Sequence, residues 1–185
     1  MNEVKFNLKR GYRIGNYRVK RRLGSGCTAE AYLAVEVPTM VERVLKLYER
    51  FDDTQHIKNL RDFEHYCWTL AQLSNIQLLP MYHHMGHAFL NDGDGIGHFY
   101  MIQEYVKGSS FELKKCTEPM KEEFLRRVRE VHQLGFALGD FSDLNVLVTK
   151  SSIRMVDCAY GQHNKPNVAI LADLKAIKKL LSQVS

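Results

Sequence analysis

The sequence lacks the cysteine patterns that hold many small proteins together. Its 185 residues contain only four cysteines, and none of them forms a CxxC pair. Zinc sites with cysteine ligands and dense disulfide frameworks depend on recognisable cysteine spacings, so neither is expected here. The isolated cysteines favour a reduced, cytoplasmic setting. They are Cys27, Cys67, Cys116 and Cys158.

Long apolar segments are also missing. The first residues, Met1 to Phe6, include two charged side chains and do not resemble the apolar run of a signal peptide. No other segment approaches the length of a membrane span. We therefore expect a cytoplasmic protein. Its 185 residues, 45% of them hydrophobic, suit one domain or two small lobes with a buried core.

Acidic residues are scarce at the N-terminal end. The formal net charge of the chain is +5, and Glu3 is the only acid within the first 22 residues. The basic run there predicts either a solvated surface or a contact with an acidic protein, nucleic acid or anionic lipid. Both interpretations stay open at this stage. The basic residues are Lys5, Lys9, Arg10, Arg13, Arg18, Lys20, Arg21 and Arg22.

The order of the expected elements favours an α+β fold with two lobes. Strand-like patterns dominate the first part of the chain and helical patterns the second. The predicted strands cover residues 17–23, 30–36, 41–48, 81–90 and 98–105. The predicted helices cover residues 54–74, 117–134 and 168–184. In the second helix, Met120, Phe124, Val128 and Val131 form the predicted buried line.

These elements divide the chain into three parts. Residues 1–16 form a basic N-terminal extension, and residues 17–107 form an N-lobe with a sheet and one helix. Residues 108–185 form a mainly helical C-lobe. The break falls near Gly108, where a Gly-Ser-Ser stretch follows the last strand of the N-lobe.

A predicted hairpin near the C-terminal end brings together residues suited to phosphoryl transfer. Residues 146–149 and 153–156 are short apolar strands joined by a polar turn. The hairpin places Asn145 beside Asp157, with Asp140 one loop away. Two carboxylates and an amide oxygen at one point suit a hard cation such as Mg²⁺ and a phosphate substrate. The alternative for these residues is ordinary turn capping.

A glycine-containing turn and a lysine lie where they could bind phosphate. Gly24, Ser25 and Gly26 connect two predicted strands, which excludes a dinucleotide fold and a Walker-type loop. A strand–turn–strand unit can cover phosphates with its backbone N–H groups. Lys46 falls on the apolar inner face of a strand, where an unpaired charge is costly and an anionic partner is expected. The alternatives are a plain hairpin turn and a solvent-facing edge lysine.

The order of these motifs resembles that of the eukaryotic-like protein kinases. The resemblance covers roughly residues 17–180 and implies a two-lobed α+β fold that binds ATP and Mg²⁺. Its motifs are Gly24-Ser-Gly with Ala31-Tyr-Leu-Ala, Val44-Leu-Lys, Tyr100-Met-Ile-Gln-Glu-Tyr-Val-Lys-Gly, Val131 to Asp140, and Asp157-Cys-Ala.

The resemblance implies roles in nucleotide binding. Gly24, Ser25 and Gly26 would cover the phosphates. Lys46 would hold the α- and β-phosphates and pair with Glu64 of the first predicted helix. Backbone hydrogen bonds to adenine would come from Glu104 and Val106, next to Gln103.

The resemblance also implies the catalytic groups. Asp140 would orient the attacking hydroxyl or accept its proton, while Asn145 and Asp157 would coordinate Mg²⁺. Ser142 stands where many of these kinases have a lysine on the γ-phosphate, which would slow transfer. Leu138 and Gly139 replace the usual His-Arg pair, so control by activation-loop phosphorylation is not expected.

The C-lobe resembles a truncated version of the family. Only residues 160–172 separate the Asp157-Cys-Ala motif from Asp173. Asp173 lies in the last predicted helix, which resembles the buried helix whose aspartate braces the catalytic loop. We therefore expect a minimal C-lobe that lacks the substrate-docking helices, as in short bacterial effector-type kinases. Such an effector would act in a host cytosol.

The function expected from these features is that of a minimal serine/threonine protein kinase. It would phosphorylate protein hydroxyls, its own or a partner's, and an activating protein partner could be required. The alternatives are a pseudokinase that binds nucleotide and acts through a partner, and a small-molecule kinase or ATPase on the same fold.

Overall fold

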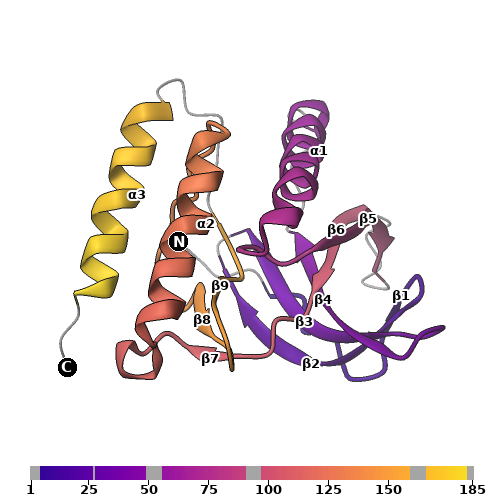
Figure 1. Cartoon of the computed structure of the whole chain (residues 1–185). Coiled ribbons are helices and arrows are strands. Elements are labelled where there is room, and N and C mark those ends of the chain that lie inside the picture. The colour runs from indigo at the N-terminus through magenta and orange to yellow at the C-terminus, as the bar shows by residue number, and fades with distance from the viewer. Residues whose placement is uncertain (1–4, 27, 49–55, 91–96, 159–165, 183–185) are drawn as a thin grey trace. The chain divides into compact units, whose positions relative to one another are not determined.

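The computed structural model describes residues 5–26, 28–48, 56–90, 97–158 and 166–182, without the side chains of residues 56–62 and Pro166. The chain divides into two compact units. Unit 1 comprises Met1–Trp68 and Tyr82–Tyr105, and unit 2 comprises Thr69–Met81 and Val106–Ser185. The elements of both are labelled in Figure 1.

Unit 1 is built on a six-stranded antiparallel sheet with the order β1-β2-β3-β4-β6-β5. The structure confirms the five strands predicted for this region and adds a short one, β1. The strands are β1 (Arg13–Ile14), β2 (Tyr17–Ser25), β3 (Ala29–Glu36), β4 (Val41–Tyr48), β5 (Tyr82–Phe89) and β6 (Gly97–Glu104).

One face of this sheet packs against α1 (His56–Leu73). The rings of Phe63 on α1 and Phe99 on β6 lie 5.1 Å apart, and the Cys67 and Met101 sulfurs are 3.9 Å apart. Burial raises the pKa of the Cys67 thiol to about 12, so this cysteine stays protonated at neutral pH. Ala71, near the C-terminal end of α1, is exposed.

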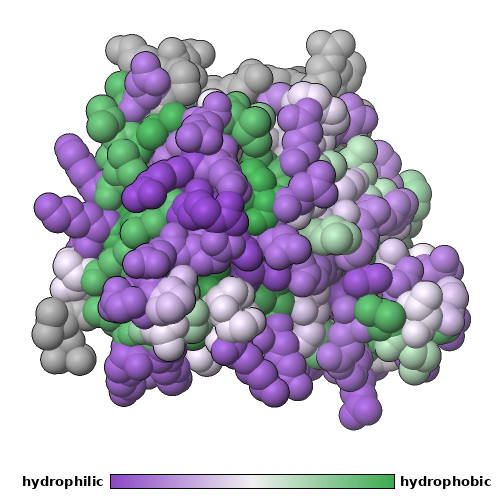
Figure 2. Space-filling model, viewed as in Figure 1, coloured by the Kyte–Doolittle hydropathy of each residue, from purple (hydrophilic) through white to green (hydrophobic). Residues whose placement is uncertain are grey.

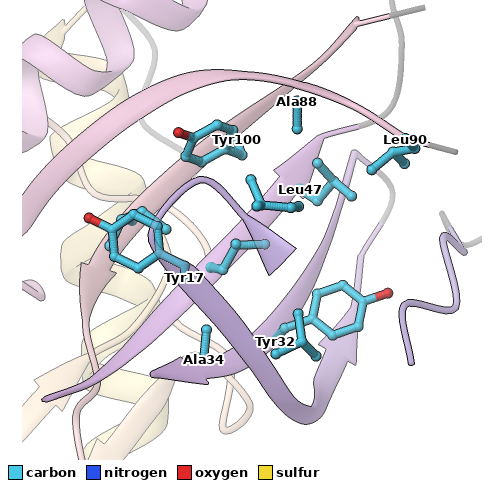
Figure 3. Packing of buried hydrophobic residues seen from close by; sticks show 11 residues of the cluster. Tyr17, Tyr32, Ala34, Leu47, Ala88, Leu90 and Tyr100 are labelled. Carbon is cyan, nitrogen blue, oxygen red and sulfur yellow. The ribbon is translucent and has the colours of Figure 1, made fainter. Parts of the chain in front are cut away.

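The opposite face of the sheet holds a cluster of buried residues (Figure 3). Phe6, Leu8 and Tyr12 pack against this cluster from the N-terminal segment. These residues, with β1, lie within unit 1, so the structure does not separate residues 5–16 from the lobe as the predicted boundary does. The clustered residues are Ile14, Tyr17, Val19, Tyr32, Ala34, Leu45, Leu47, Ala88, Leu90, Tyr100 and Ile102.

Unit 2 contains two long helices that lie side by side in Figure 1. In α2 (Glu118–Gln133), Met120, Phe124, Val128 and Val131 are the buried residues, which confirms the predicted line. The second helix, α3 (Pro166–Leu181), begins two residues earlier than predicted. Proline is well tolerated there because the first helical N–H has no intrahelical acceptor.

A small three-stranded sheet completes the regular structure of unit 2. It consists of β7 (Ser109–Ser110), β8 (Val146–Val148) and β9 (Ile153–Met155). The pairing of β8 with β9 confirms the predicted hairpin. At its turn, the Thr149 hydroxyl accepts the backbone N–H groups of Ser151 and Ser152, a serine/threonine turn that fixes the hairpin register.

The segment after α1 belongs to unit 2 because backbone and side-chain hydrogen bonds tie it there. The Leu78 carbonyl accepts the Met155 N–H at 2.9 Å, and Arg154 donates to the Leu79 carbonyl at 2.8 Å. Arg127 donates to the Gln77 carbonyl at 2.7 Å. The predicted N-lobe boundary at residue 107 misses this exchange of residues 69–81.

Apolar side chains remain on the outer surface of α3. Val168, Leu171 and Leu174 are 60%, 58% and 45% exposed, and Figure 2 shows hydrophobic surface along this helix. Spacing by three residues places them along one side of the helix.

Among the described helices, none is both long and apolar enough for a membrane span.

Candidate functional site

The loop between α2 and β8 brings Asp140 and Asn145 together. Asp140 has φ +43°, a left-handed conformation that aspartate and asparagine tolerate better than most residues. The Asn145 side-chain amide donates to the Asp140 carboxylate at 2.5 Å. The Ser142 carbonyl accepts the N–H groups of Asn145 and Val146 and closes the loop. The predicted neighbours in this loop are therefore in direct contact.

The β8–β9 hairpin brings Asp157 close to Asn145. The Asn145 carbonyl accepts the Val156 N–H at 2.8 Å, which extends the ladder by one step beyond the Val146–Met155 pair. Asp157 follows directly, and one of its carboxylate oxygens accepts the Cys158 N–H at 3.0 Å. Ala159, the next residue of the kinase-like motif, lies outside the described residues.

A buried aspartate of α3 holds the chain that leads into this loop. Asp173 is 3% exposed and accepts the Leu138 and Gly139 N–H groups at 2.6 and 2.8 Å. The His132 imidazole lies 2.9 Å from the same carboxylate. Hydrogen bonds from two successive backbone amides fix the direction of the chain just before Asp140. The predicted brace is therefore present, and His132 is a member that the sequence did not reveal.

The donor groups of this loop fit Mg²⁺. Because the Asn145 amide nitrogen donates to Asp140, its oxygen points elsewhere and is suited to a cation. Asp157 supplies carboxylate oxygen nearby, and Mg²⁺ prefers such oxygens together with substrate phosphates and water. The described residues include no cluster of three or more His, Cys, Asp or Glu side chains suited to a metal. A site with one amide, one carboxylate and substrate oxygens does not require such a cluster.

In unit 1, the predicted phosphate-binding residues lie at one end of the sheet. Lys46 is only 7% exposed, which confirms its place on the inner face. It lies opposite Ala31 on β3 and Met101 on β6. Glu64 is exposed on α1, and its pairing with Lys46 stays a prediction.

β2 continues two residues beyond the predicted strand, so Gly24 and Ser25 of the predicted glycine turn are the last residues of this strand. Gly24 and Ser25 still pair with Ala31 and Glu30 on β3, and the Gly26 N–H donates to the Ala29 carbonyl at 2.8 Å. This bond closes the turn at its base. Cys27 lies outside the described residues.

The segment predicted to contact adenine follows β6. Gln103 is buried, Glu104 is half-buried at the end of the strand, and Val106 is buried in unit 2. The chain passes from one unit to the other between residues 105 and 106, close to the predicted break near Gly108.

Solved structures that resemble this chain include protein kinases. A crystal structure of the kinase domain of PF14_0431 superposes with a TM-score of 0.62 at 17% identity, covering 82% of this chain and 53% of that one. The fold is kinase-like. A second similar structure, PpkA-294 in its apo form, has a TM-score of 0.63 at 16% identity, covering 96% of this chain and 68% of that one.

The likeness extends to the fold alone. Comparison of the sequence with family models and with curated proteins gives no match. The chain spans about half the length of the PF14_0431 kinase domain. At this identity a shared fold does not determine activity, so the chemistry has to be argued from the residues of the kinase-like site.

Proposed function

We propose that the chain is an ATP- and Mg²⁺-dependent phosphotransferase, a minimal serine/threonine protein kinase that phosphorylates hydroxyl groups of proteins. The observation that carries this proposal is the contact between Asp140 and Asn145 in a loop that buried Asp173 fixes. An exposed carboxylate in a fixed position is what a hydroxyl acceptor requires.

Each predicted residue has a task in this reaction. Asp140 orients the acceptor hydroxyl and accepts its proton, while Asn145 holds the Asp140 carboxylate in place. The Asn145 amide oxygen and the Asp157 carboxylate would hold Mg²⁺. Bound Mg²⁺ would neutralise phosphate charge. In unit 1, Lys46 and the backbone of Gly24–Gly26 bind the phosphates, and the backbone of Glu104 and Val106 binds adenine.

One position favours a second candidate, a pseudokinase that binds nucleotide and acts through a partner. Ser142 provides no positive charge two residues after Asp140, and its backbone carbonyl serves to close the loop. The exposed apolar side of α3 and the basic N-terminal run offer surfaces for a protein partner. A small-molecule kinase or ATPase would use the same three polar residues and differs only in its acceptor.

Nucleotide binding and phosphate transfer together test the proposal. The wild type is mixed with γ-labelled ATP and Mg²⁺, with itself and a basic protein as acceptors, and its thermal shift is measured alongside. Lys46→Met is expected to weaken ATP binding at least tenfold, because it removes a buried cation placed for the phosphates. Lys9→Met makes the same chemical change at an exposed site and is expected to bind ATP as the wild type does.

The outcomes separate the candidates. Transfer of labelled phosphate to protein supports the protein kinase, whereas ATP hydrolysis without protein labelling supports the small-molecule kinase or ATPase. A thermal shift without transfer supports the pseudokinase. If the wild type neither binds ATP nor transfers phosphate, the proposed function is refuted.

A further inference from the structure

Glu30 is a buried carboxylate that the proposed reaction does not use. It lies on β3, is 0% exposed, and is the β3 partner of Ser25 in the glycine turn. Residues that pair across neighbouring strands lie on the same face of the sheet, and successive residues of one strand lie on opposite faces. Lys46 pairs with Ala31, the residue after Glu30, so Glu30 lies on the face opposite Lys46. Its role therefore has to be sought away from the phosphates.

The Glu30 carboxylate accepts hydrogen bonds from both backbone and side-chain donors. One oxygen accepts the Phe6 and Asn7 N–H groups at 2.6 and 3.2 Å and the Tyr32 hydroxyl at 2.5 Å. The other oxygen accepts the Arg22 Nε–H in an ion pair. A buried carboxylate is stable only when it is paired and hydrogen-bonded in this way.

These bonds fix the N-terminal segment to the sheet through its backbone. The Leu8 N–H donates to the Tyr32 hydroxyl at 3.0 Å, and in Figure 3 this hydroxyl points away from Ala34 and Leu47. The Phe6 ring meets the His98 ring edge to face, with centroids 5.0 Å apart. Residues 6–8 are thus held by three main-chain N–H groups as well as by packing.

Arg22 extends the network to the glycine turn. While its Nε–H donates to Glu30, its terminal nitrogen donates to the Ser25 hydroxyl at 2.6 Å. A register shift between Arg22 and Gly24 bends β2 at this point. One guanidinium therefore bridges the buried carboxylate and the middle residue of the turn.

We propose that Glu30 is a positioning residue that couples the N-terminal segment to the glycine turn through Arg22 and Ser25. Docking of residues 6–8 completes the hydrogen bonds of Glu30, and Glu30 orients Arg22, which holds Ser25. The coupling itself is a property of unit 1. Its consequence for ATP rests on the proposed function: an ordered turn binds the phosphates with a smaller loss of conformational freedom.

The network also predicts acid sensitivity. Burial acts to raise the pKa of Glu30, but hydrogen bonds from Tyr32, Phe6, Arg22 and Asn7 outweigh it and hold that pKa below its ordinary value of 4.5. A lowered folded-state pKa stabilises the protein above the unfolded-state pKa, and this stability is lost as the pH falls through the folded value. Stability measured between about pH 6 and pH 3 is expected to fall less in Glu30→Gln than in the wild type. Equal slopes would contradict this prediction.

Hydrogen exchange tests the coupling without any nucleotide. In Arg22→Ala, the Gly26 amide, which donates to Ala29, is expected to exchange about three to ten times faster, the range for one lost hydrogen bond. Phe6→Ala changes the N-terminal segment that Glu30 binds, and it is also expected to speed the exchange of the Gly26 amide. Arg21→Ala removes a positive charge from the exposed residue just before Arg22, and it is expected to leave the exchange rate of the Gly26 amide unchanged. Unchanged exchange in both Arg22→Ala and Phe6→Ala would overturn the proposal.

A double-mutant cycle then tests the path of the coupling. If the segment acts through Arg22, the effects of Phe6→Ala and Arg22→Ala on Gly26 exchange and on the Kd for ATP·Mg²⁺ are expected to be non-additive. Phe6→Ala combined with Arg21→Ala is expected to be additive. Additive effects in the first pair would overturn the path through Arg22. Failure of the wild type to bind ATP would refute the proposed function, while the exchange measurement would still decide the coupling.

Discussion

Replacing Asp140 by asparagine is expected to lower γ-phosphate transfer by about 10²–10⁴-fold, the usual contribution of a positioned base. Asparagine has the size of aspartate, tolerates φ +43° and still presents an oxygen to the Asn145 amide, but it cannot accept a proton. The variant is therefore expected to keep the fold and its ATP affinity. Single-turnover transfer, with thermal unfolding as a fold check, measures the effect.

Asp143→Asn provides the matched control for this variant. Asp143 is exposed in the same loop, and its backbone carbonyl accepts the Phe111 N–H at 3.4 Å, a contact that the substitution retains. Its transfer rate is expected to stay within about twofold of the wild type. Equal rates for Asp140→Asn and the wild type would mean that another group deprotonates the acceptor, or that a contaminant transfers the phosphate.

Removing the Asp173 carboxylate is expected to cost more stability than any other single change considered in unit 2. Asp173→Ala leaves the buried Leu138 N–H, the partly buried Gly139 N–H and the His132 imidazole without their acceptor. Breaking a buried network of this kind costs about 3–5 kcal/mol. For a chain of this length that is a decrease in Tm of roughly 10 °C. Urea and thermal unfolding measure it.

Two companion variants separate the brace from helix α3 itself. Asp173→Asn keeps one acceptor oxygen and is expected to lose less stability than Asp173→Ala. Lys175→Ala changes an exposed residue of the same helix and is expected to shift the free energy of unfolding by less than about 0.5 kcal/mol. A loss under about 1 kcal/mol in Asp173→Ala would show that other contacts position the chain before Asp140.

The proposed catalytic loop and the proposed phosphate-binding turn are each supported by a buried carboxylate. Asp173 fixes the chain that presents Asp140, and Glu30 ties the N-terminal segment to the turn that contains Gly24–Gly26. Each is a buried carboxylate that accepts backbone N–H groups from a segment distant in sequence. Neither is among the residues proposed to contact ATP or Mg²⁺. Substitutions at these supports are thus expected to affect both stability and activity, unlike Asp140→Asn.

Much of the fold could be predicted from the sequence because it depends on local patterns. The buried line of α2 repeats every three or four residues, and the strands of unit 1 alternate or form short apolar runs. β1 was missed because two residues carry no periodicity. The Gly15-Asn16 dipeptide between Arg13–Ile14 and β2 is nevertheless typical of a tight hairpin turn, and that signal could have revealed it.

The rest could not be predicted because it depends on contacts between distant segments. Arg127 and Gln77 are 50 residues apart, and His132 and Asp173 are 41 apart. Single-sequence patterns do not reveal which buried polar group meets which partner. For the same reason, the sequence did not indicate that residues 69–81 belong to unit 2.

The sequence by itself determined the α+β elements and the hairpin that follows Asn145, because side-chain periodicity and turn residues act over a few positions. Only the tertiary structure decided that the basic N-terminal segment packs on the sheet, that Glu30 accepts its backbone N–H groups, and that His132 lies beside the Asp173 carboxylate. Without knowledge of its partners, a carboxylate such as Glu30 is expected at the protein surface. Its burial becomes stable only when folding brings N–H and O–H donors from other segments to it.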